Sequence, residues 1–170
     1  MGFVGKDKIG TTNIDKHRHM QFAIRNAIYG FKHHHGGPFS AVIVRDSDDR
    51  VVGFGHNEVL KRHDPTAHGE IVAIRRACKF LGTHDLTGYS LYTTGEPCPM
   101  CLAACLWANI SHIYYGCTLE DNEFIGFRDN KFDKLMPRNR DAFEGYMEEF
   151  DRDACLDLFM QYADFEHELY

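Results

Sequence analysis

The 170-residue chain has no long apolar run and no excess of positive charge. A membrane-spanning helix needs about 20 consecutive apolar residues, so we expect no transmembrane segment. The first residues, MGFVGKDKIG, also lack the apolar stretch of a signal peptide. A formal net charge of −6 argues against a polyanionic partner, because nucleic-acid-binding domains usually carry a basic surface. We therefore expect a cytoplasmic protein that binds neither membranes nor nucleic acids.

The chain also lacks internal repeats and low-complexity tracts. Apolar residues make up 44% of it and charged residues 26%, as in ordinary globular proteins. A length of 170 residues is enough to bury a substantial core in one domain. We therefore expect residues 1–170 to form a single domain.

Six cysteines are present, but only one pair has the spacing Cys-x-x-Cys, at Cys98 and Cys101. A structural zinc site needs four protein ligands, usually from two such pairs or from one pair with two histidines, and a zinc ribbon or finger lacks its second pair here. A redox pair and a catalytic zinc site with three protein ligands remain as alternatives. His68 supplies a third ligand, and Glu70 lies two residues after it. Prolines on both sides of Cys98 favour the metal-binding turn.

The remaining cysteines and a run of three histidines carry weaker signals. Cys78 falls on the apolar stripe of an expected helix, where a thiol packs as a small apolar group. Cys105 follows Cys101 by one helical turn; we favour core packing, with a contact beside the metal site as the alternative. The tract 33–35 is flanked by glycines, and we favour solvated side chains over metal binding there.

Hydrophobic periodicity and turn residues predict an alternation of helices and strands. We expect helices over 14–31, from 64–66 to 81, over 99–108 and from 154 toward 170, and strands over 40–45, 50–56, 90–94 and 112–116. Residues 121–133 are polar and suggest a loop. The strand, helix and strand over 90–116 suit a right-handed parallel crossover. His68 and Cys98 then start two helices beside the ends of parallel strands, where open α/β sheets bind their ligands.

The chain resembles the bacterial guanine deaminases of the cytidine deaminase-like superfamily, to which plant guanosine deaminases are closely related. The resemblance rests on the stretches GGPFSAVIV, GHN, DPTAHGEIVAIRRACK, EPCPMCLAACLWA and GFRDN, and it covers about residues 36–129. It implies an α/β fold of three layers, α/β/α, around a central five-stranded mixed sheet. It also implies a homodimer.

The resemblance assigns roles to individual residues. His68, Cys98 and Cys101 match the zinc ligands of the family, and Glu70 matches its proton shuttle. Two further matches are Asn57, to a substrate-contacting asparagine, and Asp129, to an acid thought to bind the purine or transfer a proton. From its own position, Asn57 either braces a loop or presents a donor and an acceptor to a heterocycle.

The implied reaction is hydrolytic deamination, most simply of guanine to xanthine and ammonia in purine catabolism. Glu70 would take a proton from a zinc-activated water, pass it to a ring nitrogen and later protonate the departing amine. Guanosine, a triazine, cytosine or cytidine are alternative substrates, and adenosine in transfer RNA fits the negative charge less well. A metal-binding scaffold without turnover is a different class of protein; retention of Glu70 argues against it.

Four residues depart from the family pattern and bear on the substrate more than on the chemistry. Gly69 replaces an alanine, Ser40 a glycine and Arg128 an acid, and Gly95 stands where relatives often have cysteine or serine. The backbone N–H of Gly69 can still serve the substrate. We also expect Phe39 to contact the substrate.

The C-terminal residues 138–170 are interpreted as a lid or a segment exchanged between subunits, with a docked terminal helix as the alternative. The N1–H and amine of guanine call for a carboxylate acceptor, and the candidates are Asp129, Glu148 and Glu149. Aromatic residues ending at Tyr170 would then exclude water. On this interpretation, removing everything after Asp153 leaves a folded, zinc-binding protein with little turnover.

Overall fold

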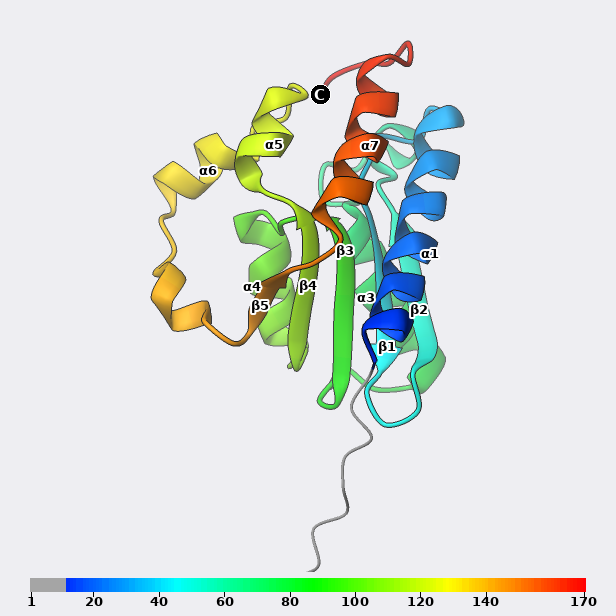
Figure 1. Cartoon of the computed structure of the whole chain (residues 1–170), viewed down its shortest axis with the longest axis vertical. Helices are drawn as coiled ribbons and strands as arrows, with labels where there is room; N and C mark the ends of the chain where they lie inside the picture. The colour runs from blue at the N-terminus through cyan, green and yellow to red at the C-terminus, as the bar shows by residue number, and fades with distance from the viewer. Residues whose placement is uncertain (1–11) are drawn as a thin grey trace, which may run out of the picture.

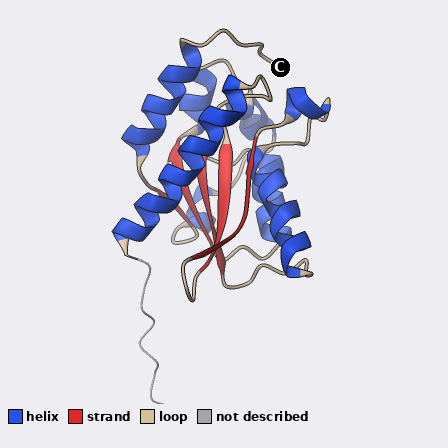
Figure 2. Cartoon of the chain, turned by 90° about the vertical axis from the view of Figure 1, so that its right-hand side faces the viewer, coloured by secondary structure: helices blue, strands red, loops and turns tan. Residues whose placement is uncertain are grey.

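The computed structural model describes residues 12–170 as a five-stranded mixed sheet between two helical layers, which Figure 2 shows in an edge view. The strand order is β2-β1-β3-β4-β5. The predicted α/β fold with a five-stranded mixed sheet is therefore confirmed. The prediction about the first ten residues lies outside the described part of the chain. Among residues 12–170, no helix has the length and apolar character required to cross a membrane.

The sheet changes direction in its middle. Its first four strands are β1 (Ser40–Arg45), β2 (Arg50–His56), β3 (Tyr89–Gly95) and β4 (His112–Cys117). β1 pairs antiparallel with both β2 and β3, whereas β3 and β4 are parallel. All four agree closely with the predicted strands. The fifth strand, β5 (Met147–Glu149), extends the sheet parallel to β4 and was not predicted, because three half-exposed or exposed residues carry no periodic signal.

Helices cover both faces of the sheet (Figure 1). α1 (Asn13–Lys32) and α7 (Arg152–Ala163) pack on one face, and α3 (Gly69–Leu81) and α4 (Pro99–Trp107) pack on the other. Successive side chains of a strand point to opposite faces. In β1, Val42 joins the cluster under α1 and α7, and Ile43 joins the cluster under α3 and α4. The sequence of a central strand that is covered on both faces is therefore a continuous apolar run.

Local sequence sets the ends of these helices. The Thr12 hydroxyl accepts a hydrogen bond from the backbone N–H of Asp15 at 3.2 Å and caps α1. α3 ends at Gly82, which adopts the left-handed conformation with φ of 68°. Pro99 occupies the first position of α4, where its missing N–H costs no hydrogen bond.

The stretch between β4 and β5 is more ordered than predicted. Where the sequence suggested a loop, the structure has α5 (Leu119–Phe124) and α6 (Asp129–Leu135), followed by the 3-10 helix η1 (Arg140–Phe143). A capping box between Thr118 and Asp121 starts α5, while exposed polar residues hide its helical periodicity. A short helix, α2 (Val59–Arg62), was also not predicted.

The predicted terminal helix is shorter than expected. α7 ends at Ala163, and residues 164–170 continue without helical structure. Four of its side chains are almost fully buried in the core under α1: Cys155, Leu158, Phe159 and Tyr162. The docked-helix alternative therefore describes α7. For residues 164–170 the lid interpretation stays a prediction.

Candidate metal centre and substrate cavity

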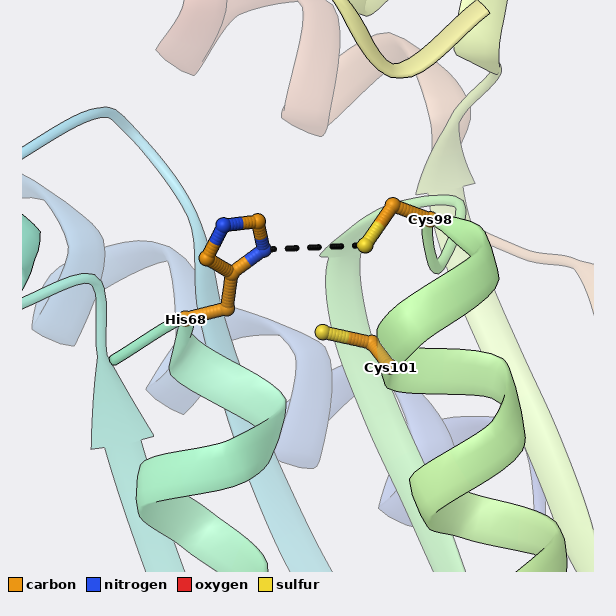
Figure 3. A group of neighbouring side chains, drawn as sticks. All are labelled: His68, Cys98 and Cys101. Carbon is orange, nitrogen blue, oxygen red and sulfur yellow. Dashed lines mark hydrogen bonds between the residues drawn. The ribbon is translucent and has the colours of Figure 1, made fainter. Parts of the chain in front are cut away.

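Three ligand atoms converge where two helices begin side by side (Figure 3). His68 is the N-cap of α3, Cys98 is the N-cap of α4, and Cys101 lies in the first turn of α4. Their ligand atoms all lie within 4.8 Å of one another, with 3.7 Å between Cys98 Sγ and His68 Nδ1. Zinc bonds of about 2.0–2.3 Å place tetrahedral ligands roughly 3.5 Å apart. One nitrogen and two sulfurs at these separations fit a zinc ion with its fourth position open.

Cys98 and His68 shift each other's pKa in opposite directions. A hydrogen bond with Cys101 and another with His68 outweigh burial and lower the pKa of the Cys98 thiol to about 4. Burial by itself lowers the pKa of His68, but the hydrogen bond and charge of Cys98 raise it overall to about 9. Burial first, and then Cys98, holds the pKa of Cys101 well above its usual range. Within residues 12–170, these three residues form the one group with metal-ligand geometry, so the tract at 33–35 and Cys105 are not part of such a group.

Glu70 stands beside the ligands in the first turn of α3. It is 6% exposed, and the Thr93 hydroxyl donates a hydrogen bond to its Oε1 at 3.2 Å. Burial raises the pKa of its carboxyl, and the negative charge of Cys98 raises it further. A carboxylate in such surroundings holds a proton more readily than one in water, as a proton shuttle requires.

The centre lies in a cavity of about 260 Å³. Its polar lining comes from both halves of the chain: Asn57, His68, Glu70, Glu96, Cys98, Asn122, Arg128 and Asp129. Its apolar lining consists of Phe39, Pro65, Pro99, Met100, Phe127, Phe132, Met136 and Tyr170. A mostly apolar cavity with a few convergent polar groups is the usual form of a small-molecule site.

Asn57 braces a loop and also lines the cavity, and its contact with a substrate stays a prediction. Its Oδ1 accepts a hydrogen bond from the backbone N–H of Val59 at 3.1 Å, which braces the loop after β2. The side chain of Asn57 also forms a hydrogen bond with Tyr170, which lines the same cavity. Gly36 packs against the same side chain, and a Cβ there would lie 2.1 Å from Asn57 Oδ1. Close packing therefore fixes the direction of this amide.

Asp129 lies at the start of α6 and faces the same cavity. Burial, followed by the charge of Cys98, raises the pKa of its carboxyl to about 6. Asn122 donates a hydrogen bond from Nδ2 to Asp129 Oδ2 at 2.9 Å. Asn122 is 1% exposed and was missed from the sequence. Its stretch looked like a loop, where an asparagine is an ordinary turn residue.

Phe39 and Tyr170 both reach the cavity, although they lie far apart in the sequence. The Tyr170 hydroxyl accepts a hydrogen bond from the backbone N–H of Gly37 at 3.1 Å, and its ring centroid lies 5.5 Å from that of Phe127. Phe39 meets the other side of the cluster, with its ring 4.8 Å from Phe127. Residues 164–170 thus bring Tyr170 over the cavity of its own chain.

The close packing around Gly69 accounts for a glycine at a position where the family usually has alanine. A Cβ on Gly69 would lie 2.9 Å from the Cα of Ser40 and 3.1 Å from the carbonyl oxygen of Phe39. The start of α3 therefore approaches the start of β1 too closely for a side chain without adjustment. Ser40 uses its hydroxyl to donate a hydrogen bond to the carbonyl of Gly55 at 2.9 Å, which ties the same corner to β2.

Glu148 and Glu149 are not brought to this cavity. Both are exposed on β5, with Glu148 Oε2 3.6 Å from His112 Nε2 and Glu149 Oε2 3.9 Å from Arg152 Nη1. β5 pairs with β4 at positions 113–115, whereas the site lies beyond the ends of the strands. Of the three candidate acids, Asp129 is the one that lines the cavity.

Comparisons with known proteins agree with this geometry. The family model for the cytidine and deoxycytidylate deaminase zinc-binding region matches residues 13–117. Guanine deaminase of Bacillus subtilis is 47% identical over 95 residues, which are 56% of this chain and 60% of the relative. A crystal structure of guanine deaminase from that organism has a TM-score of 0.68 and 40% identity, and covers 72% of this chain and 76% of its own.

Two further matches widen the comparison. A tRNA-specific adenosine deaminase of Agrobacterium fabrum is 47% identical over 79 residues, 46% of this chain and 51% of that protein. A crystal structure in complex with 2,6-diaminopurine has a TM-score of 0.80 and 26% identity, and covers 91% of this chain and 85% of its own. The matched stretch therefore spans about half to three fifths of the length of the two curated relatives. Since the family model matches well over half of the chain and includes all three metal ligands, the chain belongs to the family of the cytidine and deoxycytidylate deaminase zinc-binding region.

Proposed function

We propose that this protein is a zinc-dependent aminohydrolase that deaminates a free purine base, converting guanine and water to xanthine and ammonia. The observation that carries the proposal is the position of Glu70 beside the group of His68, Cys98 and Cys101, at one cavity. The similarity to Bacillus subtilis guanine deaminase supports guanine as the base. The complex of a similar fold with 2,6-diaminopurine supports a free base as ligand.

The proposed chemistry divides between the metal and the carboxylate. His68, Cys98 and Cys101 would hold a zinc ion, which would supply Lewis-acid activation of a water molecule. Two thiolate ligands offset most of its charge, so a base is still needed, and Glu70 is in place to act as one. Glu70 takes one proton of the attacking water and gives it to N3 of guanine. It then takes the proton of the new hydroxyl on C2 and gives it to the amine, which leaves as ammonia while C2 becomes a carbonyl. The Thr93 hydroxyl lies within hydrogen-bonding distance of one carboxylate oxygen of Glu70 and of the carbonyl of Gly95.

The remaining polar groups can orient the base. The amide nitrogen of Asn57 suits an acceptor such as the O6 or N7 of guanine, while its oxygen accepts from Val59 and its side chain also contacts Tyr170. Asp129 suits a donor edge such as N1–H, and Asn122 holds its carboxylate in place. Phe39 and Phe127 provide apolar and aromatic contacts for the ring faces.

The position of Tyr170 in the cavity wall favours a free base over larger substrates. Tyr170 packs against Phe127 and accepts a hydrogen bond from the backbone N–H of Gly37, which leaves less room for a ribose or a polynucleotide. The formal net charge of −6 also opposes transfer RNA as substrate. The similarity to a tRNA-specific adenosine deaminase makes an adenosine-bearing RNA the alternative to test.

Ammonia release from a panel of substrates tests the proposal. The panel contains guanine, guanosine, adenine, cytosine, cytidine, ammeline and a tRNA anticodon stem-loop with adenosine at the wobble position. We expect guanine to give the highest kcat/KM. Preference for the stem-loop would replace the proposal with RNA editing. Absence of turnover on every member by zinc-loaded protein would favour a metal-binding scaffold.

We also propose that the protein acts in the cytoplasm in purine catabolism, as a homodimer. These proposals rest on the family resemblance and on the absence of a membrane-spanning helix within residues 12–170. Sedimentation of the purified protein tests the dimer. A monomeric species with full activity would contradict it.

A further inference from the structure

The turn that precedes Cys98 is anchored from several sides. Glu96 follows β3 directly and is 3% exposed. Its backbone N–H donates to the carbonyl of Cys117 at 2.7 Å, and its Oε2 accepts the backbone N–H of Leu119 at 3.2 Å. The end of β4 and the start of α5 therefore hold one side of the turn that carries a metal ligand.

Arg138 holds the other side. Its side chain is 6% exposed, and Nη2 donates to the carbonyl oxygen of Pro97 at 3.0 Å. Its Nε donates to Asp133 Oδ1 at 2.6 Å, and its Nη1 lies 3.5 Å from Glu96 Oε1. Arg140 donates to the same Glu96 oxygen at 2.9 Å. The fork of one buried guanidinium thus joins α6 to both residues that precede Cys98.

A buried charge is costly unless it is paired and hydrogen-bonded. Arg138 forms hydrogen bonds from Nε to Asp133 and from Nη2 to the carbonyl of Pro97, whereas its Nη1 is buried and meets Glu96 as an ion pair without a hydrogen bond. The planar fork of arginine can hold several acceptors in fixed directions, whereas lysine offers a single point charge. The pairing therefore specifies the geometry of the turn as well as its location.

We propose that Arg138 is a positioning residue of the metal centre, which fixes the Glu96–Pro97 turn so that Cys98 is pre-oriented as a ligand. The carbonyl that Arg138 holds belongs to the peptide that leads directly into Cys98, the N-cap of α4. Groups that orient metal ligands from outside typically contribute 10- to 100-fold in metal affinity. Arg138 lies beyond residues 13–117, the part matched by the family model, so this support comes from a different part of the chain.

The inference rests on the proposed function only for the zinc ion at this centre. The test measures zinc release and not turnover, so the role of Arg138 can be correct even if the substrate assignment is wrong. Purified zinc-loaded protein is mixed with excess chelator, and the rate of zinc release is followed with a colorimetric indicator. We expect Arg138→Ala to release zinc roughly 10- to 100-fold faster than the unmodified protein. Arg138→Lys should lie nearer to Arg138→Ala than to the unmodified protein, because it restores the charge but not the fork.

Arg152→Ala is the matched control. Arg152 bonds Asp121 through Nη2 at 2.9 Å, and none of its hydrogen bonds or ion pairs involves Glu96 or Pro97. We expect zinc release from this variant within about threefold of the unmodified protein, since it loses an ion pair that lies away from the ligand turn.

Zinc release at the unmodified rate from folded Arg138→Ala and Arg138→Lys would overturn the proposal. An equal loss of melting temperature with and without zinc would then identify Arg138 as a purely structural residue. If Arg138→Ala fails to fold, the rate of zinc release from Asp133→Asn is measured to test the proposal. It weakens the partner of Nε and should accelerate zinc release in the same direction; an unchanged rate there rejects the proposal.

Discussion

The two sides of the cavity are built in different ways. On the metal side, His68, Glu70, Cys98 and Cys101 project from the first turns of α3 and α4, two helices that pack on the sheet. On the opposite side, Asp129 comes from the short helix α6, and Tyr170 from residues without helical structure. Residues that perform chemistry need fixed geometry, while those that admit and hold a substrate can sit on less rigid segments. We therefore expect changes on the metal side to abolish chemistry and changes on the other side to alter substrate affinity.

The C-terminal segment itself has two parts with different roles. α7 supplies fully buried side chains to the core, whereas residues 164–170 carry Tyr170 to the cavity. The expectation that the chain stays folded after removal of everything beyond Asp153 is therefore replaced. We now expect that truncation to expose the core under α1 and to unfold the protein. Only a deletion after Ala163 isolates the effect of covering the cavity.

The largest expected effect comes from the metal ligands. Cys98→Ala or Cys101→Ala removes one of three ligands, and zinc occupancy and turnover should both be lost. Cys105→Ala is the control, because Cys105 is fully buried in the core one helical turn away and outside the ligand group. Metal analysis of the purified variants checks this. Loss of zinc from Cys105→Ala would show that Cys105 supports the centre directly.

Glu70→Gln should separate metal binding from chemistry on the same side. The amide keeps the size of the carboxylate but cannot shuttle protons, so kcat should fall by roughly 10²- to 10⁴-fold with zinc retained. Steady-state kinetics and metal content are measured on the same preparation. Near-normal turnover would reject Glu70 as the base, and loss of zinc would make it a ligand or a structural support.

Tyr170→Ala tests the opposite side. Removal of the ring should raise the KM for guanine roughly 10- to 50-fold, in the range for a missing contact in a binding pocket, with zinc content unchanged. Tyr170→Phe keeps the contact with Phe127 and loses the hydrogen bond from Gly37, so a smaller rise is expected. Unmodified kinetics in Tyr170→Ala would remove this residue from the site.

The smallest expected effect is that of Asn122→Ala. Loss of the hydrogen bond to Asp129 should reduce kcat/KM for guanine about three- to tenfold, near the net contribution of one hydrogen bond. Asn130→Ala is the matched control. Asn130 also donates to a carboxylate, Glu123 at 2.7 Å, but does not line the cavity. Equal effects in the two variants would indicate general loosening of α5 and α6 and no role for Asn122 in the site.

The sequence by itself determined the metal side of this protein. The ligand spacing of Cys98 and Cys101 is local, and a histidine followed by Glu70 at a helix start is a short pattern that needs no tertiary information. The four longer strands were also predicted, because burial on one or both faces leaves a periodic or continuous apolar signal. The position of Asn57 at the end of β2 follows from the same signal.

Only the tertiary structure decided which residues, distant in the sequence, lie close to the metal side of the cavity. β5 has three residues, and its register against β4 directs Glu148 and Glu149 away from the cavity. Asn122 and Arg138 belong to polar stretches whose periodicity is masked by exposure, so nothing local distinguishes them from surface residues. Their roles come from contacts with Asp129 and Pro97, across seven and forty-one positions of the chain. Such contacts form when burial of the core brings the segments together, and residue spacing alone carries no record of them.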